Sequence, residues 1–150
     1  MKLAEALQER ADLNRKLDEL RSRLSNNVIV QEGEKPLEDP NELLAQFDAA
    51  IARLEELMAR INKTNAATVD GGETVTALIA RRDALTQQVR AYRDAVNWAS
   101  QTGHRARGTE IKVISAVDVR ALQKKTDQLA QELRRIDNRI QELNWKAELL

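Results

Sequence analysis

Cysteine is absent from this chain of 150 residues, which excludes disulfide bonds, thiol catalysis and cysteine-ligated metals. Its absence also fits a reducing compartment. Aromatic residues make up only 3% of the sequence, whereas charged residues make up 32%, and leucine, alanine, glutamate, arginine and glutamine are abundant. A composition of this kind is typical of long helices, and the length is enough for one domain with a modest core.

Long apolar runs are also missing. No window approaches 18 consecutive apolar residues, so we expect no transmembrane helix. The N-terminal stretch MKLAEALQERADLNRKL carries charges every few positions and has no apolar run, which is not the pattern of a Sec-type signal peptide. Together with the lack of cysteine, this predicts a cytoplasmic protein.

Neither sign of charge is in excess, because 24 basic residues balance 24 acidic ones. A neutral chain is a poor candidate for broad, non-specific binding to nucleic acid, so we expect no nucleic-acid partner. The acidic stretch from Gln31 to Asp39 lacks the spacing of an EF-hand, and the Glu-x-x-His pair of di-iron bundles is absent. Polar residues around Asp70 are explained more simply by helix capping and turns. We therefore expect no metal and no cofactor.

The strongest positive signal is a heptad pattern in the last stretch of the chain, where we predict a helix over residues 117–149. Asp118 is placed to cap its start. Apolar or small side chains recur in alternating steps of four and three: Leu122, Thr126, Leu129, Leu133, Ile136, Ile140, Leu143, Ala147 and Leu150. This a/d stripe is typical of a helix packed lengthwise along other helices, as in a coiled coil, and it needs partners because it cannot be buried alone.

Three more helices are predicted, over residues 2–26, 40–65 and 73–101. The stripe of the first is interrupted by Arg10, whose aliphatic stem can pack while its head reaches water, and the stripe of the third is interrupted by Arg82. The second helix has an uninterrupted stripe, made of Leu44, Phe47, Ile51, Leu54, Met58 and Ile61. All four predicted helices therefore have an apolar face for packing.

Two short runs of alternating or β-branched residues, at 28–31 and 110–114, predict strands. Four long helices with short connections favour up-down-up-down packing, which places the first and third connections at the same end. The first connection has an excess of acidic residues and the third of basic residues, so these two arms would attract. We therefore predict an all-α fold over a single domain, residues 1–150: an antiparallel up-down-up-down four-helix bundle with a small two-stranded β-ribbon at one end.

Trp98 and Trp145 are the two tryptophans of the chain, and neither falls on the a/d positions of its helix. Tryptophan is costly to leave in water and is enriched at protein interfaces. We therefore mark both residues as candidate contacts with another subunit or protein. The alternative is that each packs against a connection or the flank of a neighbouring helix, and the sequence leaves this open.

His104, Arg105 and Arg107 form a basic loop between flanking glycines. They are candidates for binding a phosphate or another anionic group. The alternative is an arm that pairs with the acidic connection, and we favour it because that complementary arm is present in the same sequence. His104 is the only histidine and no nucleophile motif accompanies it, so we predict no catalytic triad and no enzyme.

Several short motifs occur in a fixed order along nearly the whole chain. They are Gln31–Glu34, Glu38–Pro40, Arg60–Asn65, Ala80–Asp83, Glu110–Lys112 and Gln141–Trp145. On these motifs the chain resembles the septicolysin-like family, a bacterial family of small helical proteins. The resemblance implies a cytolysin or toxin homologue, and it brings no catalytic residues.

The sequence as a whole predicts a non-enzymatic, self-associating interaction or structural protein that forms a homo-oligomer in the cytoplasm. The off-stripe tryptophans and the ribbon are its candidate contacts, and the identity of any protein partner is left open. The alternative function is the membrane-active, cytolysin-like activity that the family resemblance implies. That alternative requires a bundle that opens or oligomerises on lipid, and only under it do we expect a membrane partner.

Overall fold

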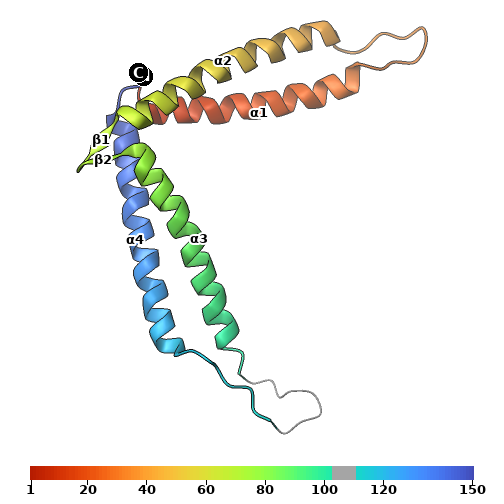
Figure 1. Ribbon diagram of the computed structural model, residues 1–150. Coiled ribbons are helices and arrows are strands. Elements are labelled where there is room, and N and C mark those ends of the chain that lie inside the picture. The colour runs from red at the N-terminus through yellow and green to blue at the C-terminus, as the bar shows by residue number, and fades with distance from the viewer. Residues whose placement is uncertain (103–110) are drawn as a thin grey trace. The chain divides into compact units, whose positions relative to one another are not determined.

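A computed structural model of the chain describes residues 1–102 and 111–150. The protein is mostly helical, and the four long helices predicted from the sequence are confirmed (Figure 1). They are α1 (Leu3–Asn27), α2 (Pro40–Ala67), α3 (Val75–Ala99) and α4 (Val119–Lys146). A small antiparallel sheet is made of β1 (Val69–Asp70) and β2 (Glu73–Thr74). None of the helices in the described part of the chain is both long enough and apolar enough to cross a membrane.

The residues divide into two compact units. The first comprises Met1–Thr74 with Glu142–Leu150, and the second comprises Val75–Gln141. Within each unit two long helices run side by side in opposite directions and form a helical hairpin (Figure 1). The boundary falls within α4, so its last turn belongs to the first unit.

In the first unit, α1 and α2 bury the apolar faces that line their hairpin. The buried residues of the two helices recur at steps of three, four and seven, as expected for helices packed lengthwise. The core includes Leu3, Ala6, Leu17, Leu20, Leu43, Ala50, Leu57 and Ile61. Asp39 caps the start of α2 by accepting a hydrogen bond from the backbone N–H of Asn41 at 2.8 Å, and Pro40 occupies the first turn.

Backbone hydrogen bonds join the two ends of the chain at the open end of this hairpin, opposite the connection between α1 and α2. The backbone N–H of Leu3 donates to the carbonyl of Ala147, and that of Leu149 donates to the carbonyl of Met1, both at 2.9 Å. The backbone N–H of Leu150 donates to the hydroxyl of Thr64 at 2.9 Å. Leu149 also joins the hydrophobic cluster around Leu3. Because these backbone groups pair with the N-terminus, α4 ends at Lys146 and does not continue to residue 149.

In the second unit, α3 and α4 also bury one apolar face each. The buried residues are Val75, Leu78, Leu85 and Val89 on α3, and Thr126, Leu129, Ala130, Ile136 and Ile140 on α4. The buried hydroxyl of Thr126 donates to the carbonyl of Leu122 at 2.8 Å, so this polar group on the apolar stripe has a partner. Four residues of the predicted stripe, Thr126, Leu129, Ile136 and Ile140, are therefore buried, and Ala130 is buried although the stripe did not include it.

The strand positions predicted from the sequence are wrong. Residues 28–31 and 111–114 form no strand, and residue 110 lies outside the described residues. The sheet forms instead at the Asp70–Gly71–Gly72 turn, where both glycines have positive φ (55° and 84°). A two-residue hairpin turn requires this backbone conformation, and glycine adopts it without strain. The sequence had predicted only a connection there.

The first connection is held to α1 by the side chains of Asn27 and Arg23. The Asn27 side chain donates to the carbonyl of Arg23 at 2.8 Å and accepts from the backbone N–H of Glu38 at 2.9 Å. The carboxylate of Glu38 pairs with the guanidinium of Arg23. The hydrogen bond that Arg23 Nε donates to Glu38 Oε2 at 3.0 Å, together with the positive charge of Arg23, lowers the pKa of Glu38. Part of the acidic charge that was expected to attract the basic arm is therefore neutralised within the hairpin itself.

We predict that Leu57→Ala lowers the free energy of unfolding by about 2–5 kcal/mol, because Leu57 is fully buried between the helices and its truncation leaves a cavity. The matched control is Leu37→Ala. Leu37 is 100% exposed, so its truncation should change the free energy of unfolding by no more than about 0.5 kcal/mol. Urea unfolding followed by circular dichroism measures both values. Equal effects of the two variants would show that Leu57 is not in the core.

We also predict that acid weakens the α1–α2 hairpin through Glu9 and Arg53. The guanidinium of Arg53 donates to both carboxylate oxygens of Glu9, at 2.7 and 3.0 Å, and this lowers the pKa of Glu9 below its ordinary value of 4.5. With a lowered folded pKa, the pair stabilises the fold above the unfolded pKa and this contribution is lost as pH falls through the folded pKa.

Glu9→Gln should therefore lose less stability than the unmodified chain between about pH 5 and pH 3. The urea midpoint measured at steps of pH across this range gives the two slopes. Arg53→Gln serves as the second variant, because removing either partner removes the pair. Parallel slopes for all three proteins would rule out a contribution of this pair to acid stability.

Candidate functional site

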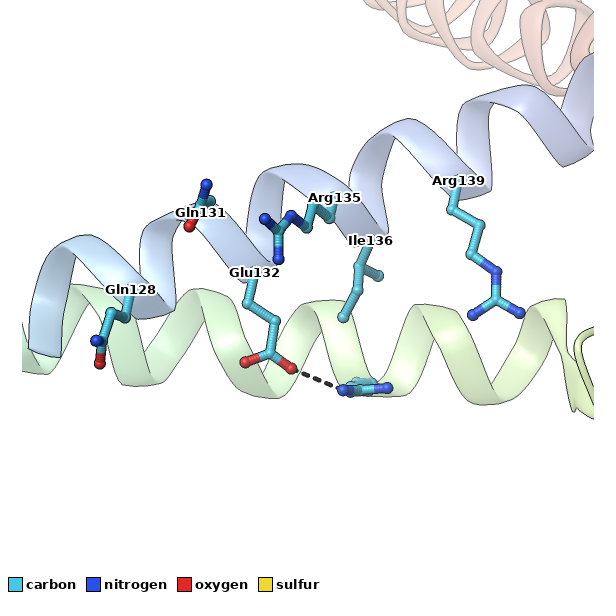
Figure 2. A pocket seen from close by; sticks show the side chains of 7 residues that line it. Gln128, Gln131, Glu132, Arg135, Ile136 and Arg139 are labelled. Carbon is cyan, nitrogen blue, oxygen red and sulfur yellow. Dashed lines mark hydrogen bonds and ion pairs between the residues drawn. The ribbon is translucent and has the colours of Figure 1, made fainter.

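A groove of about 500 Å³ lies on the second unit (Figure 2). Arg81 of α3 lines it together with six residues of α4: Gln128, Gln131, Glu132, Arg135, Ile136 and Arg139. The α4 residues recur at steps of three and four, so helical periodicity places them along one side of the helix. The groove is therefore built from regular helical structure and needs no loop to form.

The chemistry of this groove is mainly cationic. It contains three guanidinium groups and one carboxylate, and Arg81 Nη2 donates to Glu132 Oε1 at 2.7 Å. In Figure 2 this contact is the dashed line that joins Glu132 to the neighbouring helix. Guanidinium and amide groups suit anionic ligands such as carboxylates or phosphates. The carboxylate of Glu132 in the groove is engaged by Arg81.

A second groove, of about 470 Å³, lies on the first unit. It is lined by Trp145, by Met1 and by residues from the first three turns of α1: Ala4, Glu5, Gln8, Glu9 and Asp12. Its carboxylates already have partners: Glu5 accepts from the backbone N–H of Lys2 at 2.7 Å, Glu9 is bound by Arg53, and Asp12 pairs with Arg15. In this groove the indole ring of Trp145 therefore lies beside carboxylates that are already hydrogen-bonded or ion-paired within the chain.

The tryptophans predicted as contacts are both exposed. Trp98 lies one residue before the end of α3 with 70% of its surface accessible, and Trp145 lies one residue before the end of α4 with 63% accessible. Trp98 belongs to the second unit and Trp145 to the first. His104, Arg105 and Arg107 lie outside the described residues, so the anion site predicted there has no structural description.

The sequence analysis did not predict that part of the apolar stripe of α2 is exposed to solvent. Leu44, Ile51 and Met58, which the sequence assigned to the buried stripe of α2, are exposed by 43%, 41% and 46%. The row one residue earlier, Leu43, Ala50, Leu57 and Thr64, is buried instead. Both rows have seven-residue spacing, and this doubling was the available signal that α2 has a wider apolar face than one neighbouring helix can cover.

No metal site is evident in the described ranges 1–102 and 111–150, where no group of three histidine, aspartate or glutamate side chains is placed to hold an ion. In the acidic stretch before α2, Glu38 binds Arg23 and Asp39 caps the helix. These two carboxylates therefore have structural roles that explain their positions.

Comparison with known proteins gives a family without an assigned activity. Residues 10–149 match the model described as "Family of unknown function (DUF6847)". A crystal structure described as that of a functionally unknown conserved protein from Corynebacterium diphtheriae is 38% identical, with a TM-score of 0.93. The match covers 100% of this chain and 99% of that one. No curated protein matches the chain.

These matches correct the family resemblance inferred from short motifs. The septicolysin-like assignment is wrong, because the family model that spans most of the chain is a different one and neither match has a link to septicolysin. The cytolysin activity that the resemblance implied loses its support with it. The chain belongs to the family of unknown function DUF6847.

Proposed function

We propose that this chain is a non-enzymatic cytoplasmic protein that works by self-association, with Trp98 and Trp145 as contact residues. The observation that carries the proposal is the exposure of both indole rings, at 70% and 63%. Tryptophan side chains are large and mostly apolar, so leaving two of them in water is unfavourable unless a partner covers them. Tryptophan is also the residue type most enriched among those that dominate binding energy at interfaces.

The four-helix bundle predicted from the sequence is part of this proposal. Each unit is an antiparallel pair of long helices (Figure 1), and the apolar row on α2 is left outside its pair. Two such hairpins can complete an up-down-up-down bundle by packing their remaining apolar faces together. The two hairpins can come from one chain or from two copies, and only the second arrangement changes the molecular mass.

The chemistry of the two grooves supports binding more than catalysis. The groove of the second unit contains guanidinium and amide groups, and its carboxylate is bound by Arg81. The carboxylates of the groove in the first unit are held by Lys2, Arg53 and Arg15. Catalysis of proton or acyl transfer needs a nucleophile or base whose hydrogen bonds are available to a substrate. Surfaces of this kind are suited to holding another molecule in place.

We predict that Trp98→Ala and Trp145→Ala each weaken self-association by about 30-fold, as expected when an interface loses an anchoring tryptophan. Sedimentation equilibrium of the full chain over a range of concentrations should give masses above the 17.0 kDa of one chain, and lower masses for both variants. Val69→Ala is the control, because Val69 is an exposed apolar residue of β1. A mass of one chain at every concentration would refute the proposed function.

A further inference from the structure

The chain is neutral as a whole, but its two units have opposite charges. In the first unit, 17 acidic residues stand against 11 basic ones, which gives a net charge of −6. In the described residues of the second unit, 75–102 and 111–141, 11 basic residues stand against 6 acidic ones, which gives a net charge of +5. The electrostatic field of the second unit therefore attracts anions.

The groove of about 500 Å³ that contains Arg81, Arg135 and Arg139 lies on this positive unit, and we call it the arginine groove. Two helices form its walls, because Arg81 belongs to α3 and the other two arginines belong to α4. The side chain of Ile136, which is 6% exposed, extends from α4 toward α3 and adds an apolar contact (Figure 2). The volume lies within the range of ordinary small-molecule sites. The groove can therefore hold a small ligand between cationic groups from both helices.

The residues that line the arginine groove have an excess of positive charge. Among the described residues that line it, Glu132 is the only carboxylate, and it accepts a hydrogen bond from Arg81 at 2.7 Å. Three guanidinium groups and one carboxylate give these lining residues a net charge of +2. Arg135 and Arg139 are four residues apart on α4, a spacing at which like charges are neighbours and repel. An anion bound beside both of them would offset this repulsion.

The donors of the groove suit phosphate better than carboxylate. One planar guanidinium group can satisfy both oxygens of a carboxylate, so a carboxylate does not require two walls of arginines. A phosphate group has three strong acceptor oxygens that point in different directions, so it can accept from both helices at once. Among the described residues, the large apolar side chains that are exposed all lie outside the groove. This favours a dissolved ligand over a lipid surface, which needs apolar side chains to insert.

We propose that the arginine groove binds a soluble compound with a diphosphate group, which contacts Arg81 on one side and Arg135 and Arg139 on the other. Two adjoining phosphate groups bring at least two negative charges, which match the excess on the lining residues. Gln128 and Gln131 supply amide donors for other parts of the compound. The ligand joins α3 to α4 within one chain. Its binding needs no second copy and is independent of the proposed self-association.

The test is isothermal titration calorimetry of the full chain with inorganic pyrophosphate at low and at physiological salt. One pyrophosphate should bind per chain, more weakly at the higher salt. Arg135→Gln should weaken binding about tenfold, because it removes a charge-assisted hydrogen bond. Glu132→Gln should tighten binding about threefold, because it removes a negative charge from the groove and keeps an oxygen for Arg81. Absence of saturable binding by the unmodified chain would refute the proposal.

Arg134→Gln is the matched control, because it changes the charge of the chain by the same amount as Arg135→Gln. Arg134 is also exposed, lies about 100° around α4 from Arg135 and does not line the groove. It should leave the affinity within about twofold of the unmodified value. Circular dichroism checks that all variants stay folded. Equal losses in the two arginine variants would overturn the site, since only the overall charge would then matter.

Amide hydrogen exchange and three competitors identify the place and the class of the ligand. Pyrophosphate should slow exchange in α3 and α4 and leave α1 unchanged, whereas slower exchange in α1 alone would overturn the site. Citrate carries carboxylates only, so equal affinities for citrate and pyrophosphate would overturn the phosphate class. Binding to single-stranded RNA or to vesicles that contain phosphatidic acid, if pyrophosphate does not displace it, would also overturn the proposal, since the ligand would then be a polymer or a membrane.

Discussion

The structure depends on a simple constraint, which is that a helix in a hairpin can bury only the side that faces its neighbour. The polar sequence of α1 matches this constraint with one apolar row that includes Leu3, Leu17 and Leu20. On α2, two apolar rows stand one residue apart, and α1 covers the row that contains Leu57. The row that contains Ile51 is then left in water for purely geometric reasons. The exposed apolar surface of the first unit follows from this excess of apolar residues on α2.

A second constraint fixes the end of the first unit that contains both chain termini. Leu149 completes an apolar cluster with Leu3, Ala6, Leu57 and Ile61, and backbone hydrogen bonds join the first and last residues. These bonds give partners to backbone groups that the ends of α1 and α4 would otherwise leave unpaired. The same region ties together four segments of the chain, from α1, α2, α4 and the C-terminus. It closes the α1–α2 hairpin at its open end, opposite the connection between the helices.

The sequence predicted the four helices well, because their apolar residues repeat over more than 20 positions and helix capping marks several ends. It did not predict the strands, since the β-branched run at Val28–Val30 competed with the contacts that Asn27 and Glu38 make across the connection. The strands follow the glycine turn at Gly71 instead. Periodicity also could not decide whether Leu43 or Leu44 faces α1, because both rows have the same spacing. That choice depends on how the hairpin packs, which no local pattern contains.

The exposed apolar row of α2 has acidic side chains beside it, and this combination affects what the surface can bind. An apolar row by itself would attract any apolar surface, including partly unfolded chains. Asp48 and Glu55 stand next to the row, and their hydration opposes every partner that does not bring a matching charge or enough apolar contact. Binding is then selective at the cost of affinity. An apolar row bordered by carboxylates in this way discriminates between surfaces by charge as well as by apolar contact.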